Sequence, residues 1–134
     1  MRKLLTISTG TIFVLVVIYL CLCTVLSVSQ EKIIFHPSKL SQDHIFNFDE
    51  EFEEIFVKTL DGIHLHSLLF KANRSKGLVF YLHGNGGAIT TCVNAAQTYT
   101  NINYDCFVLD YRGFGKSEGE IISQNQFYSD VEIA

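Results

Sequence analysis

The sequence lacks any concentration of basic residues, since its 134 residues carry a formal net charge of −4. A nucleic-acid-binding surface needs lysine and arginine gathered on one face, so we expect no nucleic-acid partner. Cysteine is also scarce, and its spacing matches neither a dense disulfide framework nor a zinc site. We expect apolar thiols, with no metal and no cofactor, at the four positions Cys21, Cys23, Cys92 and Cys106.

The N-terminal segment has no charged residue from Leu4 to Val28, a stretch that follows Arg2 and Lys3. As a helix rising about 1.5 Å per residue, this stretch is long enough to cross a membrane with some tilt. The two basic residues favour a cytoplasmic N-terminus, which places the rest of the chain on the other side. We therefore predict a transmembrane anchor over residues 1–30.

A cleaved signal peptide is the competing interpretation of this segment. Ser27 and Ser29 place small residues at the two positions that a signal peptidase reads. The apolar stretch is much longer than the roughly 7 to 15 residues of a signal-peptide core, which favours a retained anchor. The expected protein is membrane-bound and single-pass, with its domain on the non-cytoplasmic side.

A connector is predicted over residues 31–53, in front of a domain over residues 54–134. Its apolar start, Ile33–Pro37, is expected to dock the anchor against the domain. The domain opens with two segments of strand-forming residues, Ile55–Thr59 and Ile63–Phe70. An Asp-Gly turn separates them, which predicts a β-hairpin.

Two later segments, Leu78–Leu82 and Cys106–Tyr111, are continuous apolar runs rather than alternating ones. This pattern is typical of strands buried on both faces, as in a parallel sheet covered by helices. Helices are predicted over residues 88–100 and from residue 124 to 134. A hairpin followed by strand, helix, strand and helix indicates an α/β fold.

The most informative feature is the loop His83-Gly84-Asn85-Gly86-Gly87, between the first apolar strand and the helix after it. Ligand sites of open α/β sheets lie at such strand ends. Its glycines let the backbone come close to a bound group, and free N–H groups at the helix start favour a developing negative charge. Ile89 replaces the last glycine of a dinucleotide fingerprint, and the lysine of a phosphate-binding P-loop is missing.

A second glycine-rich loop, Asp110–Gly119, follows the next strand with the sequence DYRGFGKSEG. The pair of loops resembles the alpha/beta-hydrolase superfamily, and most of all its membrane-anchored serine hydrolases with an N-terminal helix. Ile34–Pro37 is similar to an F-x-P stretch that follows the anchor in that branch. The resemblance implies a transmembrane helix followed by the first half of an alpha/beta-hydrolase sheet, truncated before the nucleophile. It also implies a small-molecule or lipid acyl ester or thioester as the substrate.

The resemblance also suggests roles for the first loop. It makes the backbone N–H of Asn85 an oxyanion-hole donor, with Gly84 and Gly86 shaping the turn and His83 orienting the loop as structural support. The superfamily's nucleophile, acid and histidine all follow the fourth strand, and this chain contains none of them. Two interpretations therefore stay open: the N-terminal portion of a serine hydrolase, or a catalytically inactive membrane-anchored remnant or interaction protein.

One serine lies in a misleading pattern. Ser117 matches G-x-S-x-G, but no strand runs directly into Gly115 and no helix signal follows the serine, so we do not expect a nucleophile.

His64 and His66 share one face of a strand without a third ligand, which favours a solvated or sheet-facing pair over a metal site.

Three charged residues near the second loop are expected to be structural rather than catalytic. Asp110 is predicted to cap a helix or fix the loop, and Asp130 in its helix is interpreted in the same way. Arg112 could bind an anion at its strand end, but a structural role in the glycine loop is favoured. The resemblance also implies that a fifth strand normally covers Leu78–Leu82. Without that strand we expect an exposed apolar edge, and residues 31–134 should associate.

Overall fold

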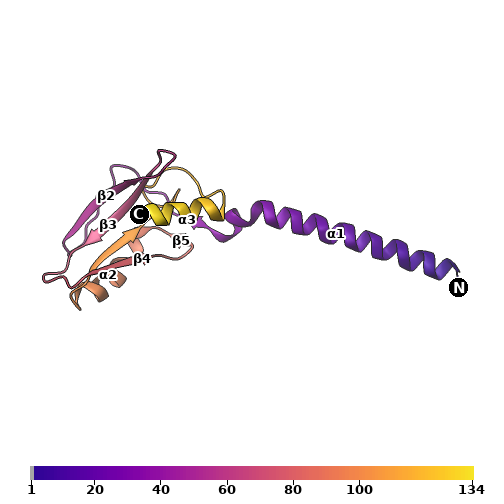
Figure 1. Ribbon diagram of the computed structural model, residues 1–134, viewed down its shortest axis with the longest axis horizontal. Coiled ribbons are helices and arrows are strands. Elements are labelled where there is room, and N and C mark those ends of the chain that lie inside the picture. The colour runs from indigo at the N-terminus through magenta and orange to yellow at the C-terminus, as the bar shows by residue number, and fades with distance from the viewer. Residues whose placement is uncertain (1) are drawn as a thin grey trace. The chain divides into compact units, whose positions relative to one another are not determined.

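The computed structural model describes residues 2–134, and the chain divides into two compact units, Met1–Ile34 and Phe35–Ala134. The first unit is the helix α1 (Arg2–Ile34), and the second contains the strands and the shorter helices (Figure 1). The helix runs past the predicted boundary at residue 30. No glycine or proline interrupts the chain there, and the first proline after the helix is Pro37.

The helix α1 is apolar over most of its length. Its segment Ser8–Ile34 has 27 residues, and large apolar side chains such as Phe13 and Val28 are exposed. A helix of 27 residues spans about 40 Å, which is long enough to cross a membrane. A signal sequence near an N-terminus has the same character.

The second unit is built on a four-stranded sheet with the order β2-β3-β6-β4. β2 (Phe52–Lys58) and β3 (His64–Phe70) pair antiparallel, which confirms the predicted hairpin. Gly62 closes the turn with a φ of 87°, a left-handed conformation that glycine adopts without steric cost.

The two apolar runs form neighbouring parallel strands. β4 (Leu78–Leu82) pairs with β6 (Asp105–Leu109), in a register that joins Leu78 to Asp105 and Leu82 to Leu109. This confirms the strand prediction, although β6 ends before Asp110 and Tyr111. The carboxyl ends of both strands therefore lie side by side at one edge of the sheet.

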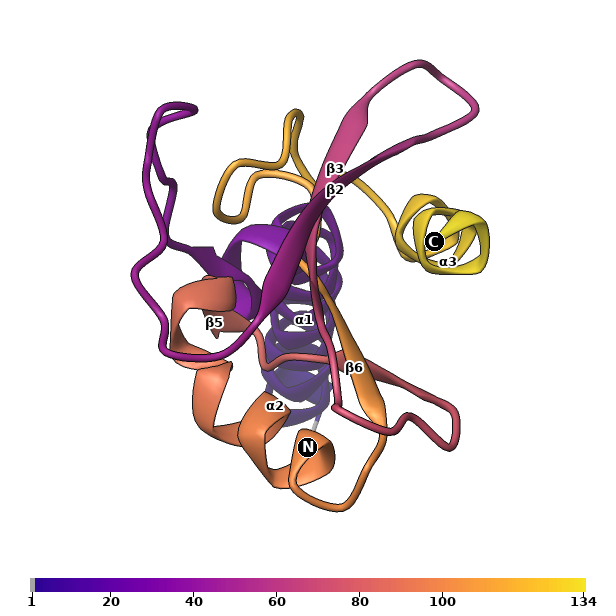
Figure 2. The ribbon, with the colours of Figure 1, turned by 90° about the vertical axis from the view of Figure 1, so that its left-hand side faces the viewer.

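Helices lie on both faces of this sheet, α2 (Val93–Thr100) on one and α3 (Gln124–Ile133) on the other (Figure 2). The α/β class is thereby confirmed. The helix predicted from residue 88 is broken, because a short 3-10 turn, η1 (Ile89–Thr91), precedes α2. The Thr91 hydroxyl donates to the Ala88 carbonyl at 2.9 Å, within this first turn.

Alternate residues of the central strands enter two separate cores. In β6, Cys106 and Val108 join the core under α2, whereas Phe107 and Leu109 join the core under α3. Cys106 is fully buried, and burial raises the pKa of its thiol to about 11. A strand that feeds two cores needs apolar residues at every position, which explains the continuous run in the sequence.

The prediction that β4 is buried on both faces is wrong. Its residues alternate in burial, and Leu78, Phe80 and Leu82 are 61%, 40% and 43% exposed. Phe80 contacts Phe107, so these side chains lie on the α3 face of the sheet. Among residues 2–134, no helix covers that face at β4, because β4 is the edge strand and α3 packs over the centre of the sheet.

This exposed face leads to a prediction about association. Residues 31–134, expressed without the apolar helix, should self-associate at micromolar concentration through the face of β4. Replacing Phe80 by lysine places a charge in the middle of that face and should return most of the protein to the monomer. Sedimentation velocity measures both states. Equal association of the parent and the Phe80→Lys variant would contradict this account.

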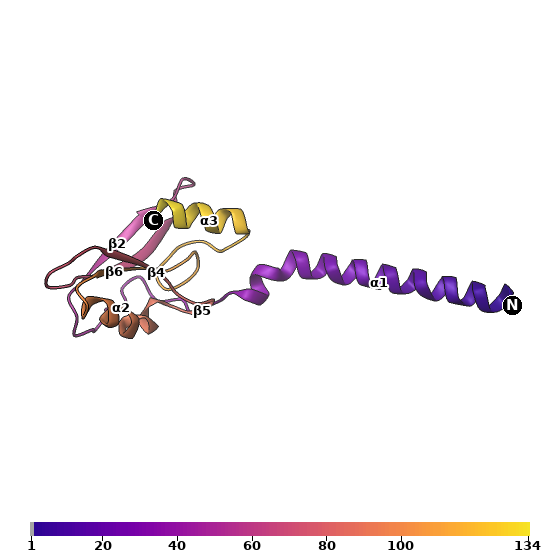
Figure 3. The same cartoon turned by 60° about the horizontal axis from the view of Figure 1, so that its bottom comes forward.

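The predicted connector contains a short strand that the sequence analysis did not identify. β1 (His36–Pro37) pairs parallel with β5 (Gly86–Gly87), and Lys39 forms an isolated bridge with Gly115. β5 lies beyond the end of β4, within the first glycine loop (Figure 3).

The start of the connector belongs to the domain core. Phe35 packs on Phe114 and Phe127, with ring centroids 6.3 Å and 5.8 Å apart. The docking of the anchor by this segment stays a prediction, while the packing of Phe35 within the domain is a finding.

Candidate active site

The two glycine loops leave the sheet at the same edge, one after β4 and one after β6. A direct bond joins them, because the Tyr111 hydroxyl donates to the His83 carbonyl at 2.6 Å. The two rings also pack against each other, with centroids 4.4 Å apart and planes tilted by 32°. Tyr111 was not singled out from the sequence as a site residue, yet it holds the loops together. This edge is where α/β sheets place their ligands.

His83 supports the first loop from below. Its ring is buried, and Nδ1 lies 2.8 Å from the carbonyl oxygen of Gly84. A carbonyl can only accept, so Nδ1 carries the proton in this contact. Nε2 lies 3.2 Å from Oδ1 of Asp110, within ion-pair range but not aligned as a hydrogen bond. The orienting role of His83 stays a prediction, and this contact supplies its physical basis.

Asn85 lies at the exposed tip of the loop. Its carbonyl accepts from the His36 N–H at 2.8 Å. Its own N–H makes no hydrogen bond within the part of the chain that the structure describes. An unpaired backbone donor at the carboxyl edge of a sheet is available to a bound oxygen.

The glycines of the loop differ in what they require. A Cβ on Gly84 would meet nothing within 4 Å, and one on Gly86 would lie 3.7 Å from the His36 carbonyl oxygen. The left-handed position is Gly87, with a φ of 89°. Gly84 and Gly86 are the glycines expected to shape the turn, whereas the residue with the strongest conformational need is their neighbour Gly87.

Asp110 is the buried centre beneath both loops. Its Oδ1 accepts from the Ile89 N–H at 2.8 Å, and its Oδ2 lies 3.5 Å from Nδ1 of His66. Burial alone would raise the pKa of this carboxyl, but the polar contacts with His66 and His83 outweigh burial and hold the pKa below its usual value. The contacts agree with the predicted loop-fixing role.

The two histidines of β3 have different surroundings. His64 is exposed and lies 3.3 Å from Glu118. His66 is fully buried, with Nε2 3.1 Å from Glu54 on one side and Asp110 on the other. Glu54 also bonds Nζ of Lys116 at 2.8 Å, so its charge is shared. The predicted solvated or sheet-facing pair therefore separates into one surface residue and one buried residue.

Ser117 is buried, and its hydroxyl both accepts and donates a hydrogen bond. The oxygen accepts from the His66 N–H at 2.7 Å, and the hydroxyl donates to the Asp110 carbonyl at 2.7 Å. The next helix, α3, begins only at Gln124. A nucleophile elbow needs a helix directly after the serine and an exposed hydroxyl, and neither condition holds at Ser117.

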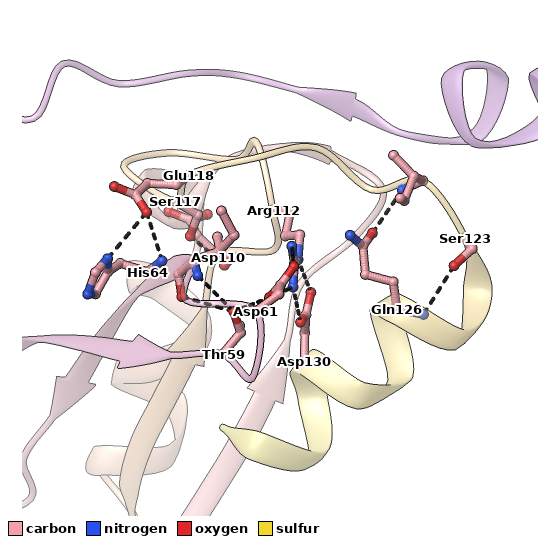
Figure 4. Close-up of polar contacts among 12 residues, drawn as sticks. Thr59, Asp61, His64, Asp110, Arg112, Ser117, Glu118, Ser123, Gln126 and Asp130 are labelled. Carbon is pink, nitrogen blue, oxygen red and sulfur yellow. Dashed lines mark hydrogen bonds and ion pairs between the residues drawn. The ribbon is translucent and has the colours of Figure 1, made fainter.

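Arg112 joins three elements of the domain (Figure 4). Its guanidinium bonds Asp130 of α3 at 2.6 Å and 2.8 Å, and Asp61 of the hairpin turn at 2.7 Å through two nitrogens. Hydrogen bonds to Asp130 and Asp61 raise the pKa of Arg112, and the bond from Arg112 lowers the pKa of Asp61. The sequence indicated a structural role for this residue but not its partner in the hairpin.

This bridge leads to a stability prediction. Arg112→Ala leaves the buried Asp130 without a partner, and the loss in unfolding free energy should be about 3 kcal/mol. The unfolding free energy of Arg112→Lys should lie between those of the parent and Arg112→Ala, because an ammonium group cannot bond both carboxylates bidentately. Thermal unfolding followed by circular dichroism measures the change.

The matched control is Lys71→Ala. Lys71 and Glu53 form an ion pair at 2.9 Å in which both side chains are exposed, so little stability should be lost. Equal destabilisation by Arg112→Ala and Lys71→Ala would contradict the importance of burial at the bridge.

The part of the chain that contains the two glycine loops also resembles known proteins. Residues 73–133, which include both glycine loops, match the family described as serine aminopeptidase, S33. The chain is 30% identical over 99 residues to protein bem46 of Schizosaccharomyces pombe, covering 66% of this chain and 33% of that protein. It is 32% identical over 77 residues to an uncharacterized protein of Acanthamoeba polyphaga mimivirus, covering 58% of this chain and 26% of that protein. The chain thus spans about a third or less of these relatives.

Solved structures share the fold. An alpha/beta hydrolase from Penicillium, GrgF, aligns with a TM-score of 0.52 and 26% identity over 61% of this chain and 30% of its own. An esterase of Pyrococcus furiosus aligns with a TM-score of 0.53 over 75% of this chain and 39% of its own, at 15% identity. With its parallel β4–β6 pair and two glycine loops, the chain belongs to the alpha/beta-hydrolase superfamily.

Proposed function

We propose that this chain supplies the oxyanion loop of a membrane-anchored serine hydrolase that cleaves acyl esters or thioesters. The observation that carries the proposal is the unpaired N–H of Asn85, a residue whose two flanking peptide groups are both held by hydrogen bonds. His83 holds the carbonyl on one side, and His36 holds the carbonyl on the other.

The orientation of the donor follows from peptide geometry. The Asn85 N–H and the Gly84 carbonyl belong to one trans peptide group, so they point in opposite directions. His83 bonds that carbonyl, and the N–H therefore points away from the imidazole. A donor fixed before substrate arrives stabilises negative charge without reorganisation, which is the property that an oxyanion hole needs.

The chemistry that this donor would assist is acyl transfer. A nucleophile attacks the carbonyl carbon, and the electron pair of the C=O bond moves onto oxygen. The Asn85 N–H would stabilise that oxygen until the C=O bond re-forms and the alcohol or thiol leaves. The nucleophile, acid and histidine would come from parts of the protein that follow the fourth strand in this superfamily.

The membrane anchor belongs to the same proposal. A retained α1, with Arg2 and Lys3 at its cytoplasmic end, would place the domain beside the membrane on the far side and give it access to lipid acyl groups. Asn73-Arg74-Ser75 is an acceptor sequence for N-glycosylation in an exposed turn. In translation with microsomes, the chain should gain one glycan that Asn73→Gln removes. An unmodified, protease-accessible domain would contradict the proposed orientation.

The direct test of the donor compares two variants of the protein translated from the complete reading frame. Asn85→Pro removes the N–H and should lower kcat for p-nitrophenyl butyrate by about a hundredfold to a thousandfold. Asn85→Ala keeps the N–H and reports the contribution of the side chain alone. Equal rates for the two variants would show that the N–H does not act in catalysis.

Labelling with a fluorophosphonate probe tests the rest of the assignment. The 134-residue chain should not be labelled at Ser117, because that hydroxyl is buried and hydrogen-bonded, whereas the complete protein should be labelled elsewhere. Labelling that Ser117→Ala abolishes would overturn the assignment of that serine. A complete protein that reacts with neither probe nor ester would leave the non-catalytic interpretation.

A further inference from the structure

The segment Phe35–Leu40, called the strap below, contacts both glycine loops through its backbone. The His36 N–H donates to Asn85 and the Ser38 N–H to Gly87, at 2.8 Å and 2.7 Å. Further along, the Leu40 N–H donates to the Gly115 carbonyl at 2.8 Å, and the Gly115 N–H donates to the Ser38 carbonyl at 2.9 Å. Four backbone bonds thus join one segment to two loops.

The ends of the strap are fixed in opposite cores. Phe35 packs with the core under α3, and Leu40 packs with the core under α2. The side chains between them, from His36 to Lys39, are exposed. The strap is therefore held by two apolar ends, while its middle acts on the loops through main-chain groups alone.

The first loop depends on this hold. Gly84, Asn85 and Gly86 are exposed, and glycine gives the backbone around Asn85 few steric limits of its own. The carbonyl of Asn85 accepts a hydrogen bond from the His36 N–H, and that bond fixes the peptide group after Asn85. With His83 fixing the peptide group before it, both dihedral angles of Asn85 are restrained.

We propose that the strap is a positioning element for the oxyanion loop. The His36 N–H holds the peptide group after Asn85, so that together with His83 it restrains the residue that carries the donor, and the bonds to Gly115 keep the first loop against the second. The inference rests on the proposed function, because it assigns a catalytic consequence to the order of that loop. It does not make His36 a catalytic residue, since the His36 side chain takes no part.

The first arm of the test measures loop order in the 134-residue chain in detergent micelles. His36→Pro removes the N–H, and His36→Ala keeps it while removing the same exposed side chain. The ¹⁵N order parameter of Asn85 should fall from about 0.85 to below about 0.6 in His36→Pro and stay high in His36→Ala. Circular dichroism checks that both variants fold. Ser38→Pro, paired with Ser38→Ala, repeats the comparison at the bond to Gly87 in case His36→Pro does not fold.

The second arm measures catalysis in the complete protein. His36→Pro should lower kcat for p-nitrophenyl butyrate by about tenfold to a hundredfold, with KM changed by about twofold or less. A structural role alone would reduce the amount of folded enzyme without changing the kcat of the folded fraction. An unchanged order parameter in the folded proline variants would overturn the proposal.

The outcomes separate the strap from the proposed function. Loss of order without loss of kcat, in a protein whose Asn85→Pro variant is inactive, would overturn the strap proposal alone. If Asn85→Pro also keeps full activity, the proposed donor is wrong, and the catalytic role of the strap is overturned with it.

Discussion

Gly115→Ala should destabilise the domain more than any other single glycine substitution in the two loops. A Cβ at this position would lie 1.9 Å from Oδ2 and 2.7 Å from Cγ of Asp110, and the φ of Gly115 is 49°. Asp110 cannot move away without breaking its bonds to the Ile89 N–H and the buried histidines. We expect the free energy of unfolding to fall by about 4 kcal/mol or more, which is enough to unfold part of the population of a typical small domain.

The measurement is thermal unfolding followed by tyrosine fluorescence, which suits a chain with six tyrosines and no tryptophan. Gly84→Ala is the control, because its Cβ meets nothing within 4 Å and its φ is not left-handed. That variant should differ from the parent by less than about 1 kcal/mol. Similar losses in both variants would mean that Asp110 does not occupy the space beside Gly115.

Asp110→Asn should have the second largest effect. The carboxylate is fully buried, it accepts from the Ile89 N–H at 2.8 Å, and ring nitrogens of His66 and His83 lie 3.5 Å and 3.2 Å from its oxygens. Asparagine would remove the negative charge and turn an amide N–H₂ toward groups that need an acceptor. A buried donor that loses its acceptor costs about 1 to 3 kcal/mol, and more where the lost acceptor is charged. Urea unfolding at neutral pH measures the loss.

The same residue predicts a dependence on pH. The pKa of Asp110 is lower in the folded protein than its ordinary value of 3.8. Its contribution to stability is therefore complete above the unfolded pKa and is lost as the pH falls through the folded pKa. The parent should lose stability below about pH 4, and Asp110→Asn should lose less over the same range. Asp49→Asn, at an exposed carboxylate, serves as the control. Parallel pH profiles for the parent and Asp110→Asn would contradict the assignment.

Local signals in the sequence were enough to predict much of the fold. The apolar run Leu78–Leu82 predicted β4 with its observed bounds, and the Asp-Gly turn predicted the hairpin. The helix predicted from residue 124 begins at Gln124, where Ser123 caps it by accepting from the Gln126 N–H. Each of these elements depends on residues that are close together in the chain.

Other features depended on partners that are distant in the chain. The strand β1 could not be predicted, because His36 and Pro37 have exposed side chains and pair with Gly86 and Gly87 through the backbone. A backbone pairing of this kind leaves no apolar periodicity in the sequence. The burial of β4 was overestimated for a related reason, since an apolar run does not reveal whether a neighbour covers both of its faces.

The candidate site shows the same division. The two loops and the structural character of Asp110 and Arg112 followed from glycine patterns at strand ends. The partners that fix the loops, Tyr111 and the N–H of His36, carried no signal of their own. A tyrosine hydroxyl and a main-chain N–H become informative only when the fold brings their acceptors within reach.

The most direct test of the central claim is a crystal structure of the complete protein with a phosphonate bound to its nucleophile. The phosphonyl oxygen stands in for the oxyanion of the tetrahedral intermediate. We predict that this oxygen lies about 2.7 to 3.1 Å from the backbone nitrogen of Asn85. A phosphonate attached to Ser117, or one whose oxygen lies out of hydrogen-bond reach of Asn85, would contradict the account.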